Sequence, residues 1–295
     1  MQSKILTSRR SALRTMTIAG AAASLGTILP SRTAEAMEAN AQEDTSAKAR
    51  AFALIGDRYH NPDYIRTALG STLVQDAGLT IDFTDEEKEL SYETLKRYSI
   101  LIMFRDGQRF PGGYGSYGGP YIVSVPPIRK EISDSPVGWM TDEQGKAVKR
   151  WVQEGGSLMS YHNNCHVSLM NKVYREVQGA YYTGHPVIRP FKVKITNKDH
   201  PITKGVNDFV VTDEQHYMAY EKDPKHVLAV SVNEDGLTYK DLSGRTSNTC
   251  QAAWAYDYGK GRVCFMAPGH MITALWNPEY EKMQKNAVKW LLRKT

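Results

Sequence analysis

Three short apolar runs place the strongest limit on the folds open to this chain. They cover residues 51–56 (AFALIG), 99–104 (SILIMF) and 157–161 (SLMSY). A run of four to eight largely apolar residues is typical of a strand buried on both faces, as in a parallel sheet. Helix signals stand between these runs, including Asn61-Pro62-Asp63, which is typical of an N-cap followed by a first-turn proline and acid. The first half of the chain therefore predicts alternating strands and helices.

The second half of the chain is richer in strands. Residues 79–83 are a further early strand candidate, and helices are expected at 92–97, from the capping box Thr141/Gln144 through Trp151, and at 167–177. After Gly184, strand-like runs follow at 187–195, 208–212, 226–232, 249–257 and 262–267, and Asn277 caps a final helix. This change predicts antiparallel strands added to the parallel core of an α/β domain that spans 51–295.

The first residues carry the pattern of an export signal. Ser8-Arg9-Arg10 begins a twin-arginine motif, a small apolar run follows it, and Ala34-Glu35-Ala36 offers a cleavage site. The apolar run is short and rich in Gly and Ala, whereas a membrane span needs about 20 strongly apolar residues. We therefore expect residues 1–36 to be a twin-arginine signal peptide and 37–50 a flexible leader. The mature protein would be periplasmic or exported, with no membrane partner after processing.

The positive charge of the chain is concentrated in that signal. The chain has a formal net charge of +5, and residues 1–36 hold five Lys or Arg residues against Glu35 alone, so four of the five charges lie there. The rest of the chain is nearly neutral and has no clustered basic stripe. Nucleic-acid binding is therefore excluded as a predicted function, because it depends on such a stripe.

Five of the eight histidines come just after strand-like runs. In an open α/β sheet, the carboxyl ends of the strands face one crevice, where ligands bind. Imidazoles delivered there would form one site for a first-row metal or for proton transfer. The alternative is that each is a separate surface or loop histidine. The five are His60, His162, His185, His216 and His270.

The three cysteines do not predict a disulfide framework, since an odd number cannot pair completely. Cys250 and Cys264 flank a hairpin that turns at 258–261, and this register sets Cys264 opposite a residue near Ala255. We therefore expect these two cysteines to be small buried side chains.

Several motifs in the second half occur in the order seen in ThuA-like (trehalose utilisation) proteins. They are His185-Pro186, 199–205 (DHPITKG), 213–218 (DEQHYM), 258–263 (YGKGRV) and Gly269-His270, continued by Trp276 and Lys289-Trp290. The chain resembles this family over about residues 50–295. The resemblance implies a class I glutamine amidotransferase-like fold, which is a flavodoxin-like, doubly wound and mostly parallel sheet. It also implies a link to sugar metabolism.

Amidotransferase chemistry itself is not expected. Enzymes of that class place a nucleophilic cysteine on a sharp strand-to-helix turn, whereas here 157–161 runs into His162-Asn163-Asn164-Cys165-His166. Cys165 lies beyond the expected turn. A helix N-terminus and neighbouring histidines could activate its thiol, but a packed thiol is the simpler interpretation.

The clustered histidines allow two mechanisms. In one, Zn²⁺ or a similar divalent metal is held by imidazoles and a carboxylate, with a position left open for substrate. In the other, Glu214 or His162 acts as a base without a metal. The predicted metal ligands are His162, His185, Glu214 and His270. The predicted catalytic residues are His162, Glu214, Asp213 and His60.

Five further residues are candidates for substrate binding. Asp57, Arg58 and Arg105 follow strands and would line the crevice, although they could equally be ordinary loop charges. Tyr217 and Trp276 could stack on a sugar ring, with core packing as the alternative. The Gly- and Tyr-rich stretch within 105–128 is either an aromatic lid over a sugar-sized ligand or a flexible loop.

Two functions fit these observations. The first is an exported enzyme that acts on a small-molecule carbohydrate, such as a keto-sugar or glycoside, by metal-assisted or acid/base hydrolysis, elimination or isomerisation. The second is a non-catalytic carbohydrate-binding or scaffold protein with the same crevice.

Overall fold

The computed structural model describes residues 49–111 and 136–295. The predicted signal peptide, residues 37–48 of the leader and most of the Gly- and Tyr-rich stretch lie outside the described residues. Arg50, placed in the leader by the sequence pattern, is already the first residue of strand β1 (Arg50–Ile55). Within the described part of the chain, no helix has the length and apolar character needed to span a bilayer.

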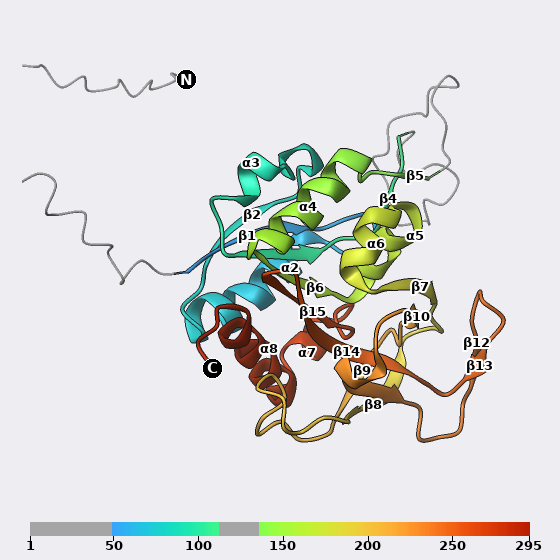
Figure 1. Ribbon diagram of the computed structural model, residues 1–295. Coiled ribbons are helices and arrows are strands. Elements are labelled where there is room, and N and C mark those ends of the chain that lie inside the picture. Colours follow the sequence, from blue (N-terminus) through green and yellow to red (C-terminus); the bar gives the residue numbers. More distant parts are fainter. Residues whose placement is uncertain (1–48, 112–135) are drawn as a thin grey trace, which may run out of the picture. The chain divides into compact units, whose positions relative to one another are not determined.

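Nine strands form one mixed sheet in the order β2-β1-β3-β6-β15-β14-β11-β8-β9 (Figure 1). The five strands from β2 to β15 are parallel, and β14, β11, β8 and β9 are added antiparallel to their neighbours. Counted along the chain, the parallel strands have the order 2-1-3-4-5, which is the flavodoxin-like order. The bounds are β1 Arg50–Ile55, β2 Thr80–Thr84, β3 Ile100–Phe104, β6 Ser157–Tyr161, β8 Arg189–Ile195, β9 Phe209–Asp213, β11 Val227–Val232, β14 Thr249–Tyr258 and β15 Gly261–Met266.

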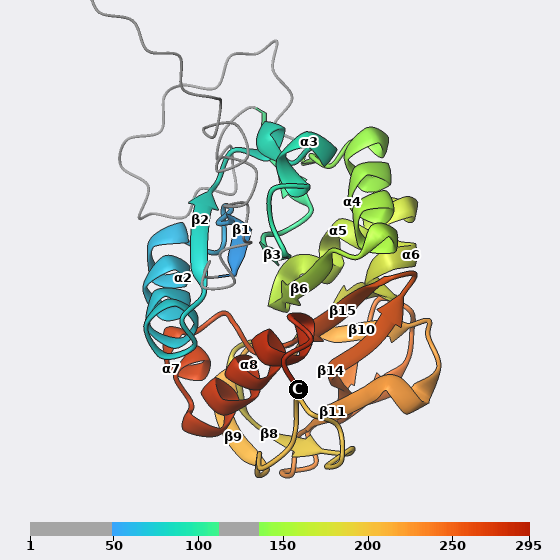
Figure 2. The ribbon, with the colours of Figure 1, turned by 60° about the vertical axis from the view of Figure 1, so that its left-hand side comes forward.

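Helices cover both faces of the parallel part, so the predicted doubly wound α/β fold is confirmed. One layer contains α3 (Tyr92–Leu95), α4 (Asp142–Glu154), α5 (Val167–Met170) and α6 (Lys172–Gln178). The other contains α2 (Pro62–Leu69), the π-helical turn η1 (Gly70–Asp76), α7 (Ile272–Leu275) and α8 (Pro278–Leu291), which lie together in Figure 2. Between the layers, β1, β3 and β6 are buried along almost their whole length. This explains their continuous apolar runs.

The local signals in the sequence act as expected at helix starts. Asn61 and Asn277 cap α2 and α8, and Thr141 and Gln144 form the capping box of α4. Each cap satisfies backbone N–H groups that the first helical turn leaves without partners.

The hairpin of β14 and β15 also follows its prediction. Cys264 pairs with Ala255 across the two strands, and all three cysteines, which lie within the described residues, are buried free thiols.

Two features differ from the predicted elements. The helix expected at 167–177 is divided into α5 and α6, because the backbone at Asn171 is extended and its side chain caps the start of α6 by accepting the Tyr174 N–H. A small antiparallel sheet of β7 (Ala180–Gly184) and β10 (Tyr217–Tyr220) was not expected either. These strands are short and mix aromatic with small residues, so they lack a clear alternating pattern. They matter because His185 and His216 stand at their adjoining ends.

The remaining strands are two-residue pairs. They are β4 (Gln108–Arg109) with β5 (Val137–Gly138), and β12 (Tyr239–Lys240) with β13 (Thr246–Ser247). Short 3₁₀ turns occur at η2 (Glu87–Glu89), η4 (His162–His166) and η5 (Pro224–His226).

Candidate functional site

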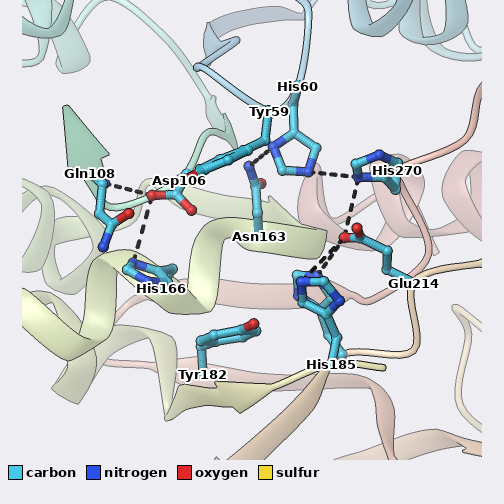
Figure 3. Close-up of a pocket in the computed structure, with 11 residues that line it drawn as sticks. Tyr59, His60, Asp106, Gln108, Asn163, His166, Tyr182, His185, Glu214 and His270 are labelled. Atoms are coloured by element: carbon cyan, nitrogen blue, oxygen red, sulfur yellow. Dashed lines mark hydrogen bonds and ion pairs between the residues drawn. The ribbon is translucent and has the colours of Figure 1, made fainter. Parts of the chain in front are cut away.

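Five histidines from distant parts of the chain surround the carboxylate of Glu214. Glu214 directly follows β9, and imidazole nitrogens lie close to its Oε2 atom on several sides (Figure 3). The distances to Oε2 are 3.4 Å from His162 Nε2, 3.7 Å from His185 Nε2, 3.3 Å from His216 Nε2 and 3.2 Å from His270 Nδ1. His60 Nε2 lies 3.2 Å from His270 Nδ1 and completes the group. The carboxyl edge of the sheet thus gathers these side chains in one place.

His162 stands on a sharp turn between β6 and η4. Its backbone φ is 44°, in the left-handed region that residues with a Cβ seldom occupy. Gly269 makes the close approach possible, since a Cβ there would lie 2.7 Å from the His162 Cβ. The His162 side chain is fully buried, and its Nδ1 lies 2.8 Å from the carbonyl oxygen of Ala267. Because that oxygen can only accept, Nδ1 carries the ring proton and Nε2 presents a lone pair toward Glu214.

His60 is oriented by a buried carboxylate. Its Nδ1 donates to Asp57 Oδ1 over 2.9 Å, and Asn163 donates to Asp57 Oδ2 over 2.6 Å. The Nε2 atom of His60 therefore also presents a lone pair toward the centre. A carboxylate behind an imidazole is the arrangement that orients histidine ligands in metal sites. Although burial alone would raise the pKa of Asp57, hydrogen bonds from His60 and from the backbone N–H groups of Asp106 and Tyr59 hold that pKa below its ordinary value.

The charge states of the cluster favour a bound cation. Burial alone would raise the pKa of Glu214, but hydrogen bonds from His216 and His270 are among the contacts that outweigh it, so the pKa is lowered and the carboxylate is anionic. Burial lowers the pKa of His162 and of His216, which keeps both imidazoles neutral. Among the described residues, His162 Nε2 has no hydrogen-bond donor. A cation bound between this lone pair and the carboxylate, which are 3.4 Å apart, would satisfy both atoms.

The donor atoms form two groups that could each hold a metal ion. The first group is His60, His162, Glu214 and His270, and the second is His185, Glu214 and His216. Within each group the donor atoms lie within 4.8 Å of one another. A tetrahedral ion bound at about 2.0–2.1 Å holds its ligands about 3.3–3.4 Å apart. Three of the separations in the first group, between His162 and Glu214, His270 and Glu214, and His60 and His270, are 3.2–3.4 Å and fit that geometry.

A cavity of about 350 Å³ opens beside the cluster. Figure 3 shows Glu214 and His270 on one side of it, with Asp106, Gln108 and His166 on the other. Two aromatic rings add apolar surface, and they come from Tyr59 and Tyr182. Its size and mixed lining suit a small polar ligand.

A family model described as "Trehalose utilisation" (ThuA) matches residues 122–291, which is more than half of the chain. The chain belongs to the ThuA family. The resemblance expected from the sequence motifs is therefore confirmed. No curated protein matches the chain.

Solved structures with the same fold include putative ThuA-like proteins. One, from Bacteroides uniformis, is 17% identical with a TM-score of 0.55, covering 84% of this chain and 91% of that one. Another, from Parabacteroides merdae, is 15% identical with a TM-score of 0.58 and the same coverage. A cytoplasmic protein from Salmonella typhimurium is 14% identical with a TM-score of 0.51, covering 83% of this chain and 99% of that one. At these identities the comparisons establish the fold.

In this ThuA-family chain, the residues predicted as metal ligands are divided between the two groups. His162, Glu214 and His270 lie in the first group, where His60, predicted as catalytic, joins them. His185 lies in the second group with His216. The sequence motifs could not show this division, because the ligands come from separate loops.

Asp213 is placed differently from its neighbour Glu214. The Asp213 side chain is buried and accepts hydrogen bonds from the backbone N–H groups of Gly269, Glu214 and Met271, over 2.6, 2.9 and 3.2 Å. It thereby fixes the loop that carries His270. This placement favours a positioning role over the catalytic role expected from the sequence.

The other predicted binding residues lie around the site rather than in the cavity beside the histidines. Asp57 orients His60, and Arg105 forms an ion pair with Glu87. The Arg58 guanidinium lies 4.4 Å from the centre of the Phe110 ring, in a neighbouring hollow that Asp57 and Arg105 also line.

Tyr217 and Trp276, which were predicted to stack on a sugar ring, are not among the described residues that line the cavity. The Tyr217 ring is buried, and its hydroxyl donates to the Ser247 carbonyl. Trp276 is 39% exposed and directly follows α7. Tyr59 and Tyr182 are the aromatic residues that face the cavity instead.

Cys165 is a poor nucleophile. It is fully buried in η4, and burial raises the pKa of its thiol well above the ordinary value. The structure thus supports the expectation that Cys165 is a packed thiol.

Several cavity residues are absent from the sequence prediction. Asn163 and His166 belong to the polar run that follows β6, and Gln108 lies beyond β3, just after Asp106, which the sequence pattern places in the crevice with Arg105. The polar run after β6 could have indicated that His166 belongs to the site, since two histidines four residues apart after a buried strand lie at the same sheet edge. Tyr182 gives no comparable signal because it lies on the unexpected strand β7.

Asp106 gives the site a pH-dependent effect on stability. Burial, together with the neighbouring charge of Asp57, raises the pKa of Asp106 to about 7. The folded protein therefore retains a proton between about pH 4 and 7, where the unfolded chain has lost it, so stability falls as the pH rises through this window. Asp106→Asn removes this effect. Between pH 5 and 8, the variant should gain roughly 2–3 kcal/mol relative to the wild type in urea unfolding. A difference that is the same at both pH values would contradict the assignment.

Proposed function

We propose that this ThuA-family protein is a metal-dependent enzyme that acts on a small carbohydrate, such as a glycoside or keto-sugar, by hydrolysis, elimination or isomerisation. The observation that carries the proposal is the buried His162 Nε2, whose lone pair faces the anionic Glu214 at 3.4 Å. The cavity beside it and the family's description support a carbohydrate as ligand. The proposal places this activity outside the cytoplasm, since residues 8–14 carry the twin-arginine pattern.

The first donor group would hold the ion. His60, His162, His270 and Glu214 provide imidazole and carboxylate ligands, which suit Zn²⁺ and similar ions. When bound, such an ion supplies Lewis acidity to a substrate oxygen. Asp57 keeps His60 in the correct tautomer, and Asp213 keeps the His270 loop in place.

The opposite wall of the cavity would move protons. Asp106 Oδ1 lies 3.6 Å from His166 Nδ1, and both side chains line the cavity. With its pKa raised to about 7, Asp106 can release or accept a proton near neutral pH. Tyr59 and Tyr182 would hold the sugar ring between the two walls.

Chelation and one substitution test the proposal. The full chain is assayed with a panel of glycosides that includes trehalose, and with their keto-sugar forms, before and after chelator treatment and Zn²⁺ addition. Turnover should be lost on chelation and regained with the metal. His162→Ala should lower kcat by more than about 100-fold, with sugar affinity in calorimetry changed far less.

His226→Ala serves as the control, because His226 packs against Tyr256 and belongs to neither donor group. A protein that binds a sugar but turns over none of the panel, with or without metal, would point to the non-catalytic carbohydrate-binding function. Turnover that survives complete metal removal would contradict the metal-dependent mechanism.

A further inference from the structure

His185 and His216 form a second set of donor atoms around Glu214, distinct from those of His60, His162 and His270. His185 Nε2 and His216 Nε2 lie 3.7 and 3.3 Å from Glu214 Oε2, and the two rings stack at 5.0 Å with only 10° between their planes. The rings therefore present their Nε2 atoms to the same carboxylate side by side. His185 comes from the end of β7 and His216 from the start of β10, so the small sheet of β7 and β10 delivers this pair.

The tautomer of His185 leaves its Nε2 atom free to bind a cation. Its Nδ1 lies 2.8 Å from the carbonyl oxygen of Pro186, which can only accept, so the ring proton is on Nδ1. His162 has the same arrangement with Ala267 on the buried side. A backbone carbonyl that fixes the proton on one imidazole nitrogen is typical of histidines that ligate metals through the other.

The number of donors also distinguishes the two groups. The first group has four protein donors, whereas the second has three. Three protein donors leave a coordination position open, as in catalytic sites. His185, Glu214 and His216 all line the cavity, whereas the first group includes one member, the fully buried His162, that does not. An ion in the second group would therefore face a ligand in the cavity.

We propose that His185, His216 and Glu214 form a second divalent-metal site, with Glu214 shared between two ions. This inference rests on the proposed function, since it adds to the ion held by the first group. Two imidazoles with one carboxylate suit Zn²⁺, Co²⁺ or Ni²⁺ better than Mg²⁺ or Ca²⁺. A second ion would have a coordination position open for a carbohydrate oxygen, in addition to the Lewis acidity that the first ion would supply.

Cobalt titration of the full chain tests the second site. The protein is stripped with chelator, titrated with Co²⁺ and followed by visible absorption, and bound cobalt is counted by mass spectrometry after gel filtration. We expect two ions for each wild-type chain. His185→Ala and His216→Ala should each lower the count to one, and His226→Ala should leave it at two.

Two variants are used so that misfolding of one of them does not decide the result. The His185 side chain is 32% exposed, so its removal leaves no large buried cavity, and circular dichroism checks the fold. A wild-type count of one that His185→Ala does not change would overturn the second site and leave the first intact. A wild-type count of zero would overturn the proposed function as well.

Discussion

Glu214→Ala should remove divalent metal from the protein and lower its affinity for Zn²⁺ by more than about 100-fold. The Glu214 carboxylate is the one donor common to both groups and the only anion in either. Loss of an outer-shell partner alone costs about 10–100-fold in metal affinity, so loss of this central ligand should exceed that range. The measurement is competitive titration of stripped protein with Zn²⁺ and a chromophoric chelator.

Two further variants make this result specific. Glu214→Gln keeps the size of the side chain but not its negative charge, and it should lose most of the affinity as well. Glu234→Ala removes a carboxylate that is half exposed and paired with Lys192, so it should bind Zn²⁺ as the wild type does. Retention of wild-type affinity by Glu214→Ala would show that the histidines bind no ion through this carboxylate.

The fold could be predicted from the sequence because its core strands carry their own signal. The apolar runs at β1, β3 and β6 are continuous because each strand is buried on both faces. The sheet of β7 and β10 could not be predicted, since its strands are short and pair only with each other. Its existence depends on tertiary packing rather than on a local pattern.

The site was predictable in outline for a similar reason. Strand ends from separate segments meet at one sheet edge, and this brings His60, His162 and His270 together. It was not predictable which of two neighbouring side chains would face the site. Asp213 and Glu214 are adjacent, yet one carboxylate bonds backbone N–H groups and the other faces the histidines. Which of two neighbours faces the site depends on where the strand ends, and local spacing does not fix that point.

Asp213 connects the stability of the fold to the geometry of the site. Its carboxylate accepts three backbone N–H groups, and two of them belong to Gly269 and Met271, on either side of His270. The Asp213 side chain is fully buried, so water cannot replace it as an acceptor without a rearrangement of the loop. Removal of the carboxylate would therefore both destabilise the protein and release a metal-ligand candidate.

Asp213→Ala should lower the free energy of unfolding by about 3–5 kcal/mol, because each buried N–H group left without a partner costs about 1–3 kcal/mol. Thermal unfolding of the stripped protein should show a fall in Tm of roughly 10 °C. Asp213→Asn retains one oxygen acceptor and should lose about half as much. Asp235→Ala is the control, since Asp235 is exposed and accepts a single loop N–H. If Asp213→Ala unfolded with the wild-type Tm yet bound Zn²⁺ more weakly, the carboxylate would act on the ion itself rather than by holding the His270 loop.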